Sequence, residues 1–149
     1  MKLLIISIFC LSLGLGFVSC NNEEDPVKEM IISEDFKVEG KWNFIKVSGD
    51  GVLFGIPTSS TDDEPMGYVE FFEDFTGYAD FSVNLLDNDF TEQQDFNWVR
   101  TAVNEIVLNK SDGKVDTWHI VNANNQAVEA EWDISIAGNT ATVKAMMEK

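Results

Sequence analysis

The sequence predicts an all-β domain that folds as an antiparallel, up-and-down β-barrel of about eight strands. Apolar and polar residues alternate with a period of two along several stretches, and no long stretch has the periodicity of an amphipathic helix. Glycine, asparagine and aspartate separate these stretches at short intervals, as expected for hairpins. A run of hairpins buries one face either by closing into a barrel or by folding into a two-sheet β-sandwich, which is the alternative architecture.

The N-terminus has the pattern of a secretory signal peptide. Lys2 supplies a positive charge, and the apolar run 3–18 follows it. This run is shorter than the roughly 20 residues that a membrane-spanning helix needs, whereas its length suits the apolar region of a signal peptide. The run ends at Ser19-Cys20, where the chain becomes polar, so we predict that residues 1–19 are a signal peptide.

A small residue followed by cysteine, directly after the apolar region, resembles the lipobox of bacterial lipoproteins. The resemblance implies that the Cys20 thiol receives a diacylglycerol, that cleavage occurs just before this residue, and that its new amine is acylated. Two or three acyl chains hold a protein to a membrane, since each buried methylene contributes about 0.8 kcal/mol. The alternatives are a plain secretory signal with an incidental cysteine and an uncleaved anchor.

Residues 20–38 are expected to form the lipidated N-terminus and a tether. Asn21 follows the cysteine, so the pattern does not resemble inner-membrane retention, which the resemblance associates with aspartate at this position. The acidic cluster 23–25 resembles a short export signal of surface lipoproteins. The expected location is therefore the cell envelope, on the outer membrane, either exposed at the cell surface or facing the periplasm.

The composition limits what the domain can bind. The 149-residue chain carries 10 Lys+Arg against 26 Asp+Glu, a net charge of −16. Its length suits one domain, which we place at residues 39–149. This charge disfavours nucleic acid and anionic membrane surfaces, so contact with the membrane is expected through the lipid on Cys20. Cys10 leaves with the signal peptide and the Cys20 thiol carries the lipid, so no thiol remains for a disulfide, a nucleophile or a metal site. No cofactor or metal is predicted.

The clearest hairpin lies at the C-terminus. Apolar residues alternate with polar ones over 128–136 and again over 141–147, and Gly138-Asn139 separates the two runs. A two-residue turn at this dipeptide would bring Trp132 opposite Ala145 and keep all apolar residues on one face.

The other strands follow from the same alternation. A hairpin is expected around 73–77, with an odd number of residues in its loop. It joins one strand that contains Val69 and Phe71 to a second strand that contains Ala79 and Phe81. Within residues 41–47 the alternation changes phase, which indicates a β-bulge. Further strands are expected at 52–56, returning across a turn at 48–51, and at 96–100, 105–110 and 115–121.

Two short motifs add a family resemblance. Gly40-Lys41-Trp42 begins a strand soon after the tether, and the segment 68–71 leads into an acidic turn followed by Gly77 and an aromatic strand. Together they look like the lipocalin-like domain of small bacterial lipoproteins, over about residues 38–147. The resemblance implies a small barrel, and it implies little about chemistry because most members have no established ligand.

Residues that could carry catalysis or bind a metal form no recognisable motif. His119 is the only histidine, and alternation turns it away from the apolar face. The segment 87–98 begins like a calcium-binding loop, but Glu92 stands at the sixth position where that loop has glycine. We therefore predict that the protein is not an enzyme. A carboxylate-based glycan hydrolase is the third hypothesis, because so acidic a chain offers many carboxylate pairs.

The remaining candidates for a binding site are aromatic. They either pack as core or line a pocket for a small hydrophobic ligand, which would enter beside loops near 56–66 and 86–95. These residues are Trp42, Trp118, Trp132, Phe71 and Phe81. The sequence thus predicts a non-enzymatic binding or interaction module. The alternative is a structural or accessory subunit of a cell-envelope assembly, whose partner would be an envelope protein.

Overall fold

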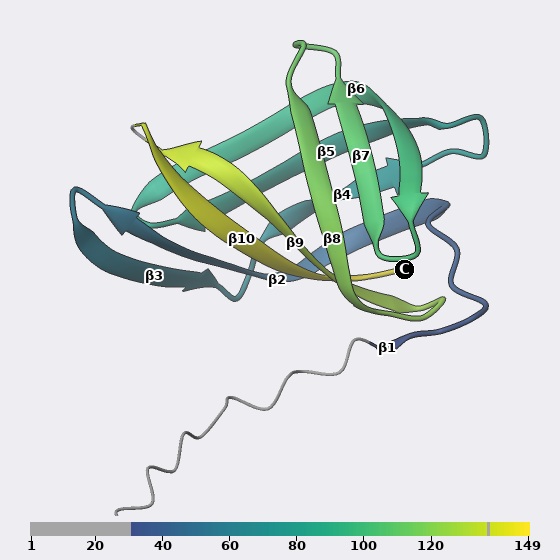
Figure 1. The fold of residues 1–149 in the computed structure, drawn as a ribbon, viewed down its shortest axis with the longest axis horizontal. Coiled ribbons are helices and arrows are strands. Elements are labelled where there is room, and N and C mark those ends of the chain that lie inside the picture. Colours follow the sequence, from purple (N-terminus) through teal and green to yellow (C-terminus); the bar gives the residue numbers. More distant parts are fainter. Residues whose placement is uncertain (1–30, 137) are drawn as a thin grey trace, which may run out of the picture.

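The computed structural model describes residues 31–136 and 138–149, and in this part of the chain every regular element is a β-strand (Figure 1). Eight antiparallel strands close into a barrel, and two further strands lie outside it. The predicted up-and-down barrel is therefore confirmed, and the two-sheet sandwich is wrong. Within these residues no helix is long and apolar enough to cross a membrane. The predicted signal peptide 1–19 and Cys20 lie outside the described residues.

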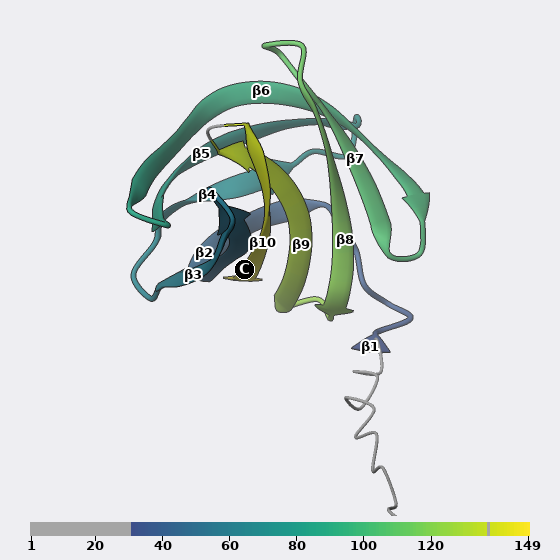
Figure 2. The same ribbon diagram turned by 60° about the vertical axis from the view of Figure 1, so that its left-hand side comes forward.

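The barrel follows the order of the sequence, with each strand paired to the next. Its strands are β2 (Gly40–Leu53), β4 (Met66–Phe71), β5 (Thr76–Leu85), β6 (Asn88–Ala102), β7 (Glu105–Lys110), β8 (Val115–Ala123), β9 (Ala127–Ile136) and β10 (Asn139–Glu148). Pairing of β10 with β2 closes the circle (Figure 2). Outside it, β1 (Ile31–Ile32) runs parallel to β8, and β3 (Ile56–Asp62) pairs with the second half of β2.

The bulge predicted in the first strand is confirmed. Phe44 pairs with Met147 and Lys46 pairs with Met146, so Ile45 is the additional residue on β2. Phe44 is buried and Ile45 is exposed, which is the change of phase seen in the sequence.

The predicted turn at 48–51 is wrong, because β2 continues to Leu53 and turns at Phe54-Gly55, where both φ angles are positive. One of the two glycines that suggested a turn, Gly51, is required by crowding instead. A Cβ atom on Gly51 would lie 2.9 Å from the Cβ of Ala141 on β10. Glycine at this strand position therefore allows close approach of the neighbouring backbone.

The hairpin between β4 and β5 has the predicted odd-numbered loop. The Phe72 amide donates to the Thr76 carbonyl oxygen at 2.8 Å, which encloses three residues. Val69 pairs with Ala79 and both side chains are buried, as the alternation predicts.

The C-terminal hairpin exists, but its predicted register is wrong by two residues. Ile136 pairs with Asn139, and Trp132 lies opposite Val143 instead of Ala145. Moving the turn by one residue shifts every pair by two, so each apolar side chain stays on the inner face. Hydrophobic alternation alone cannot distinguish these two registers.

The two predicted loops near 56–66 and 86–95 are mostly strand. Residues 56–62 form β3, and β6 begins at Asn88 after a tight turn in which Leu86 and Asp87 both have positive φ. The segment that resembles a calcium loop is therefore extended strand from its second residue onward. Turns built from non-glycine residues with positive φ are uncommon, which explains why the sequence did not indicate this one.

Gly77 lies where the barrel wall is tightly packed. A Cβ atom there would lie 2.3 Å from the Phe96 ring, whereas on Gly49, another strand glycine, it would meet Leu85 at an ordinary 3.5 Å. We expect Gly77→Ala to lower the free energy of unfolding by about 1–3 kcal/mol through overpacking. Gly49→Ala, the matched control, should change it by less than about 1 kcal/mol, as measured by urea unfolding; equal effects would contradict this account.

Candidate functional site

One half of the barrel interior contains a cavity of about 260 Å³. Its apolar wall comes from seven strands, β4 to β10, and the aromatic residues Phe81, Phe90, Trp118 and Trp132 are part of the lining. Lys114, Asp133 and Ser135 also line it and are exposed, so the cavity reaches the surface at this end of the barrel. We call this end the open end.

The opposite end of the barrel is filled. Phe36 and Val38, from the segment before β2, are buried, and the Trp42 indole N–H donates to the Val38 carbonyl oxygen at 2.7 Å. The Lys149 ammonium lies 4.5 Å from the centre of the Trp42 ring. Part of the segment predicted as tether thus packs on the barrel, and it leaves only one end open.

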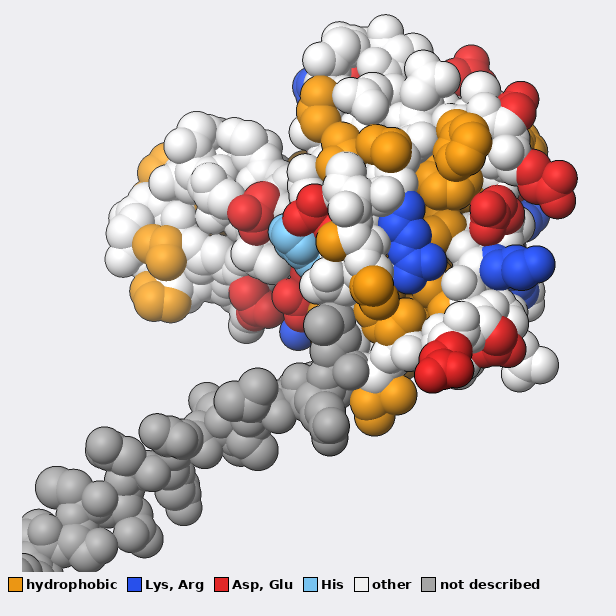
Figure 3. Space-filling view, turned by 45° about the vertical axis from the view of Figure 1, so that its right-hand side comes forward, with side chains coloured by type: hydrophobic (Ala, Val, Ile, Leu, Met, Phe, Trp, Pro, Cys, Tyr) orange, Lys and Arg blue, Asp and Glu red, His pale blue; other side chains and the backbone are white. Residues whose placement is uncertain are grey.

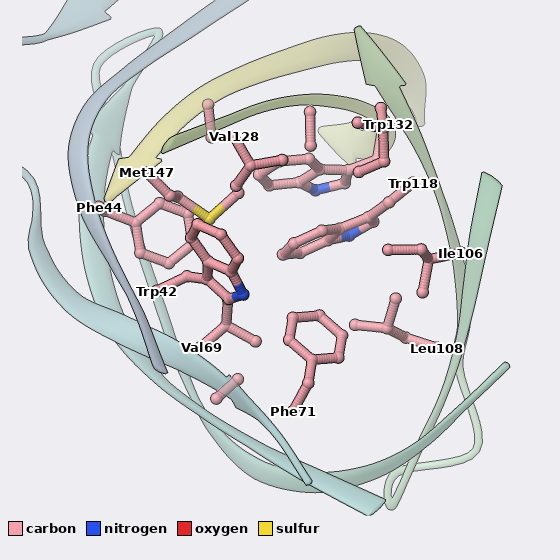
Figure 4. Packing of buried hydrophobic residues seen from close by; sticks show 14 of the residues in the cluster. Trp42, Phe44, Val69, Phe71, Ile106, Leu108, Trp118, Val128, Trp132 and Met147 are labelled. Carbon is pink, nitrogen blue, oxygen red and sulfur yellow. The ribbon is translucent and has the colours of Figure 1, made fainter. Parts of the chain in front are cut away.

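The structure separates the aromatic candidates into two groups. Trp118, Trp132 and Phe81 line the cavity. Trp42 belongs to the filled end, and Phe71 packs edge-on against Trp118 with ring centroids 6.1 Å apart, as core. Figure 4 shows all of these except Phe81 in the buried cluster.

Two of the aromatic residues in the cavity wall are tryptophans that contact each other. The rings of Trp118 and Trp132 stack with their centroids 4.6 Å apart and their planes within 17° (Figure 4). Within the described residues, the Trp118 indole nitrogen is the buried side-chain polar atom without a hydrogen-bond partner. A buried donor of this kind is costly unless another group accepts its hydrogen bond.

A charged cluster forms the polar wall. The Lys110 ammonium lies 2.6 Å from a Glu92 carboxylate oxygen and 2.6 Å from an Asp116 carboxylate oxygen, and only 10% of its side chain is exposed. Burial by itself would lower the pKa of Lys110, but hydrogen bonds and attraction from Asp116 and Glu92 outweigh it and raise that pKa. The Lys110 ammonium is therefore charged at neutral pH, and it is paired with both carboxylates.

This cluster was not singled out from the sequence, although alternation contains the signal. Lys110 continues the inward-facing series of Ile106 and Leu108 on β7. Glu92 and Asp116 likewise share the parity of the buried residues on β6 and β8. Charged residues that extend an apolar face mark the place where the core gives way to a polar cavity.

The barrel wall is incompletely paired beside the cavity. The ladder between β8 and β9 extends from Ala123–Val128 to His119–Glu131, and beyond it the strands diverge (Figures 1 and 2). We call this divergence, between residues 115–118 and 132–136, the open seam. Asp116, Trp132 and Asp133 line both the cavity and a hollow on the outer side of the open seam.

Access to the cavity differs from the sequence prediction. Of the two segments predicted to lie at the entrance, 86–95 contributes Phe90 and Glu92 to the cavity lining, and 56–66 contributes no residue to it. The residues at the surface opening come mainly from the start of β8 and the end of β9.

His119 lies outside the cavity, on the outer hollow. It is exposed, with its Nδ1 atom 3.8 Å from a Glu105 carboxylate oxygen, and Figure 3 shows it among acidic side chains. Residues 31–136 and 138–149 contain no group of three or more side chains arranged to hold a metal ion.

No protein-family model matches this chain, and no curated protein matches it significantly. The geometry of the barrel therefore carries the functional argument.

Removing the Lys110 ammonium should leave two poorly solvated carboxylates facing each other. We expect Lys110→Met to lower the free energy of unfolding at pH 7 by about 1–3 kcal/mol, and the exposed Lys114→Met control by under about 0.5 kcal/mol. Because the folded-state pKa of Lys110 is raised above 10.5, the stabilisation that its ammonium gives the folded state is fully present below that pH and is lost as the pH rises through the raised value. Urea unfolding at pH 7 and in an alkaline series measures both effects. If Lys110→Met and Lys114→Met had equal stabilities at pH 7, the proposed role of Lys110 would be wrong.

Proposed function

We propose that the protein is a lipid-anchored, non-enzymatic binding module that holds a small hydrophobic ligand in the open end of its barrel. The observation that carries this proposal is the aromatic-lined cavity, closed at one end and open at the other. A barrel of about eight strands is the size at which the interior is either filled or holds one small ligand.

The dimensions of the cavity support a small ligand. Ligand pockets commonly measure about 300–1,000 Å³, and the cavity, at about 260 Å³, lies just below that range. Its walls are mostly apolar, with few polar groups at one side. This is the arrangement in which burial supplies affinity and a few polar contacts supply orientation.

The anchor suits this use of the barrel. β1 lies beside Ala123, at the far end of β8 from the residues that line the cavity, so the chain reaches the barrel at its filled end. Residues 21–30 could span at most about 35 Å if fully extended. An anchor at Cys20 would therefore attach the filled end to the outer membrane and leave the open end accessible, at the cell surface or in the periplasm.

A second candidate function is a structural or accessory subunit of a cell-envelope assembly. It is favoured by the tip of the β2–β3 hairpin, which projects from the barrel (Figure 1). Val52, Phe54 and Ile56 are exposed there, and Phe54 is 82% exposed. An apolar tip of this kind is suited to contact with an envelope protein.

Ligand binding can be tested with residues 21–149, which contain every strand and all of the described core. We expect native mass spectrometry of this chain, recovered from a bacterial extract, to show one bound small molecule. A neutral fluorescent probe, N-phenylnaphthylamine, should bind and change the tryptophan emission, since Trp118 and Trp132 line the cavity.

Phe90→Ala should weaken binding of the probe about 5- to 30-fold, because it removes an aromatic side chain from the wall. Phe72→Ala removes an exposed phenylalanine away from the cavity and serves as the matched control. Equal affinities of the two variants, or no binding to the unaltered chain, would overturn the proposal.

The anchor has its own test. In the bacterium that makes the protein, radiolabelled palmitate should enter the chain, and Cys20→Ala should abolish labelling and leave the precursor uncleaved. Ser19→Ala keeps a small residue before the cysteine and should still be labelled. Recovery of Cys20 with a free thiol from the unaltered protein would exclude lipid anchoring.

A further inference from the structure

The charges around the cavity indicate which kind of ligand it accepts, provided that the proposed binding function holds. Three acidic residues, Glu92, Asp116 and Asp133, line the cavity together with two basic residues, Lys110 and Lys114. The lining therefore has a surplus of negative charge within a chain whose net charge is already −16.

Both ammonium groups already have carboxylate partners. Lys110 contacts Glu92 and Asp116, each at 2.6 Å, and is nearly buried by them. Lys114 points to Asp112, with 2.8 Å between the charged atoms. An anionic head group would have to displace one of these carboxylates and would face the others uncompensated, which is unfavourable at the edge of an apolar cavity.

At the open seam, Asp133 is bonded to a neutral group, unlike the ion-paired carboxylates described above. The Asp133 carboxylate accepts a hydrogen bond from the Thr142 hydroxyl at 2.8 Å, and Asp133 borders both the cavity and the outer hollow. Glu131 borders the same hollow, where Lys144 pairs with it at 2.7 Å. A neutral hydroxyl donor leaves the negative charge of Asp133 available to a cation.

The aromatic walls provide an independent reason to expect a cation. Trp132 lines both the cavity and the outer hollow, so an ammonium head at the open seam would lie beside an aromatic ring, and such rings attract cations. Aromatic rings with a nearby carboxylate are the usual means by which proteins recognise amines and quaternary ammonium ions.

We infer that the cavity selects cationic amphiphiles, with an apolar body between the aromatic walls and an amine or quaternary ammonium head at the open seam beside Asp133. Carboxylate amphiphiles such as fatty acids are disfavoured. The negative field of the whole chain would further raise the local concentration of such cations and speed their association at low salt.

The test uses three probes with the same eight-carbon chain: octylammonium, octanol and octanoate. Each competes with N-phenylnaphthylamine for residues 21–149 at pH 7, followed by fluorescence. We expect octylammonium to bind most tightly, octanol less tightly and octanoate least. Raising the salt concentration from about 0.02 to 0.5 M should reduce the advantage of octylammonium over octanol, since screening weakens exposed charge pairs.

A pair of variants isolates the charge at the open seam. Asp133→Asn should weaken octylammonium about two- to fivefold and leave octanol unchanged. Glu148→Gln makes the same carboxylate-to-amide change on an exposed residue at the filled end of the barrel, and it should change neither affinity.

The outcomes distinguish the two proposals. If N-phenylnaphthylamine and all three competitors fail to bind, the binding function itself is wrong and the charge selectivity falls with it. If they bind but octanoate matches or exceeds octylammonium, or if Asp133→Asn has no more effect than Glu148→Gln, the binding function stands and the selection of cations is wrong.

Discussion

The structure depends on closure of one antiparallel sheet by the ladder between β10 and β2. Without that ladder, the first and last barrel strands would present free edges and one apolar face would stay open to water. With it, alternate side chains pack in one enclosed interior; Figure 2 shows the curved sheet, and Figure 4 shows part of the buried cluster inside it. The bulge at Ile45 lets β2 keep this ladder along its length while Phe44 and Val47 both face inward.

The interior is filled unevenly, and this difference creates the candidate site. At the filled end, Phe36, Val38 and Trp42 leave no opening towards the cavity. At the open end, Lys110 and its two carboxylate partners replace the apolar side chains that a solid core would need. Burying charges is costly unless they are paired, so these three residues are mutually satisfied, and they border a space instead of filling it.

The seam between β8 and β9 links the cavity to the surface charge of the protein. Its ladder ends at His119 and Glu131, where the two strands separate beside Trp132 and Asp133. An aromatic residue of the cavity wall and an aspartate bonded to a neutral hydroxyl are therefore neighbours at the opening. This combination connects the acidic composition, which by itself describes only solubility, with a specific place in the fold.

By itself, the sequence determined which face is buried in most of the strands it predicted, because alternation with a period of two reports side-chain direction directly. It thereby predicted the bulge before Val47 and the inward direction of the tryptophans on β8 and β9, and it favoured the barrel while leaving the two-sheet sandwich as the alternative. Tertiary structure decided the strand registers and where each strand ends. The strand β2 continues past Gly49 and Gly51 to Leu53, and Trp132 lies opposite Val143. Shifts of two residues preserve the apolar face, so only the turn and the closing ladder distinguish them. The cavity likewise required tertiary structure, because it depends on Glu92, Lys110 and Asp116 meeting from three different strands.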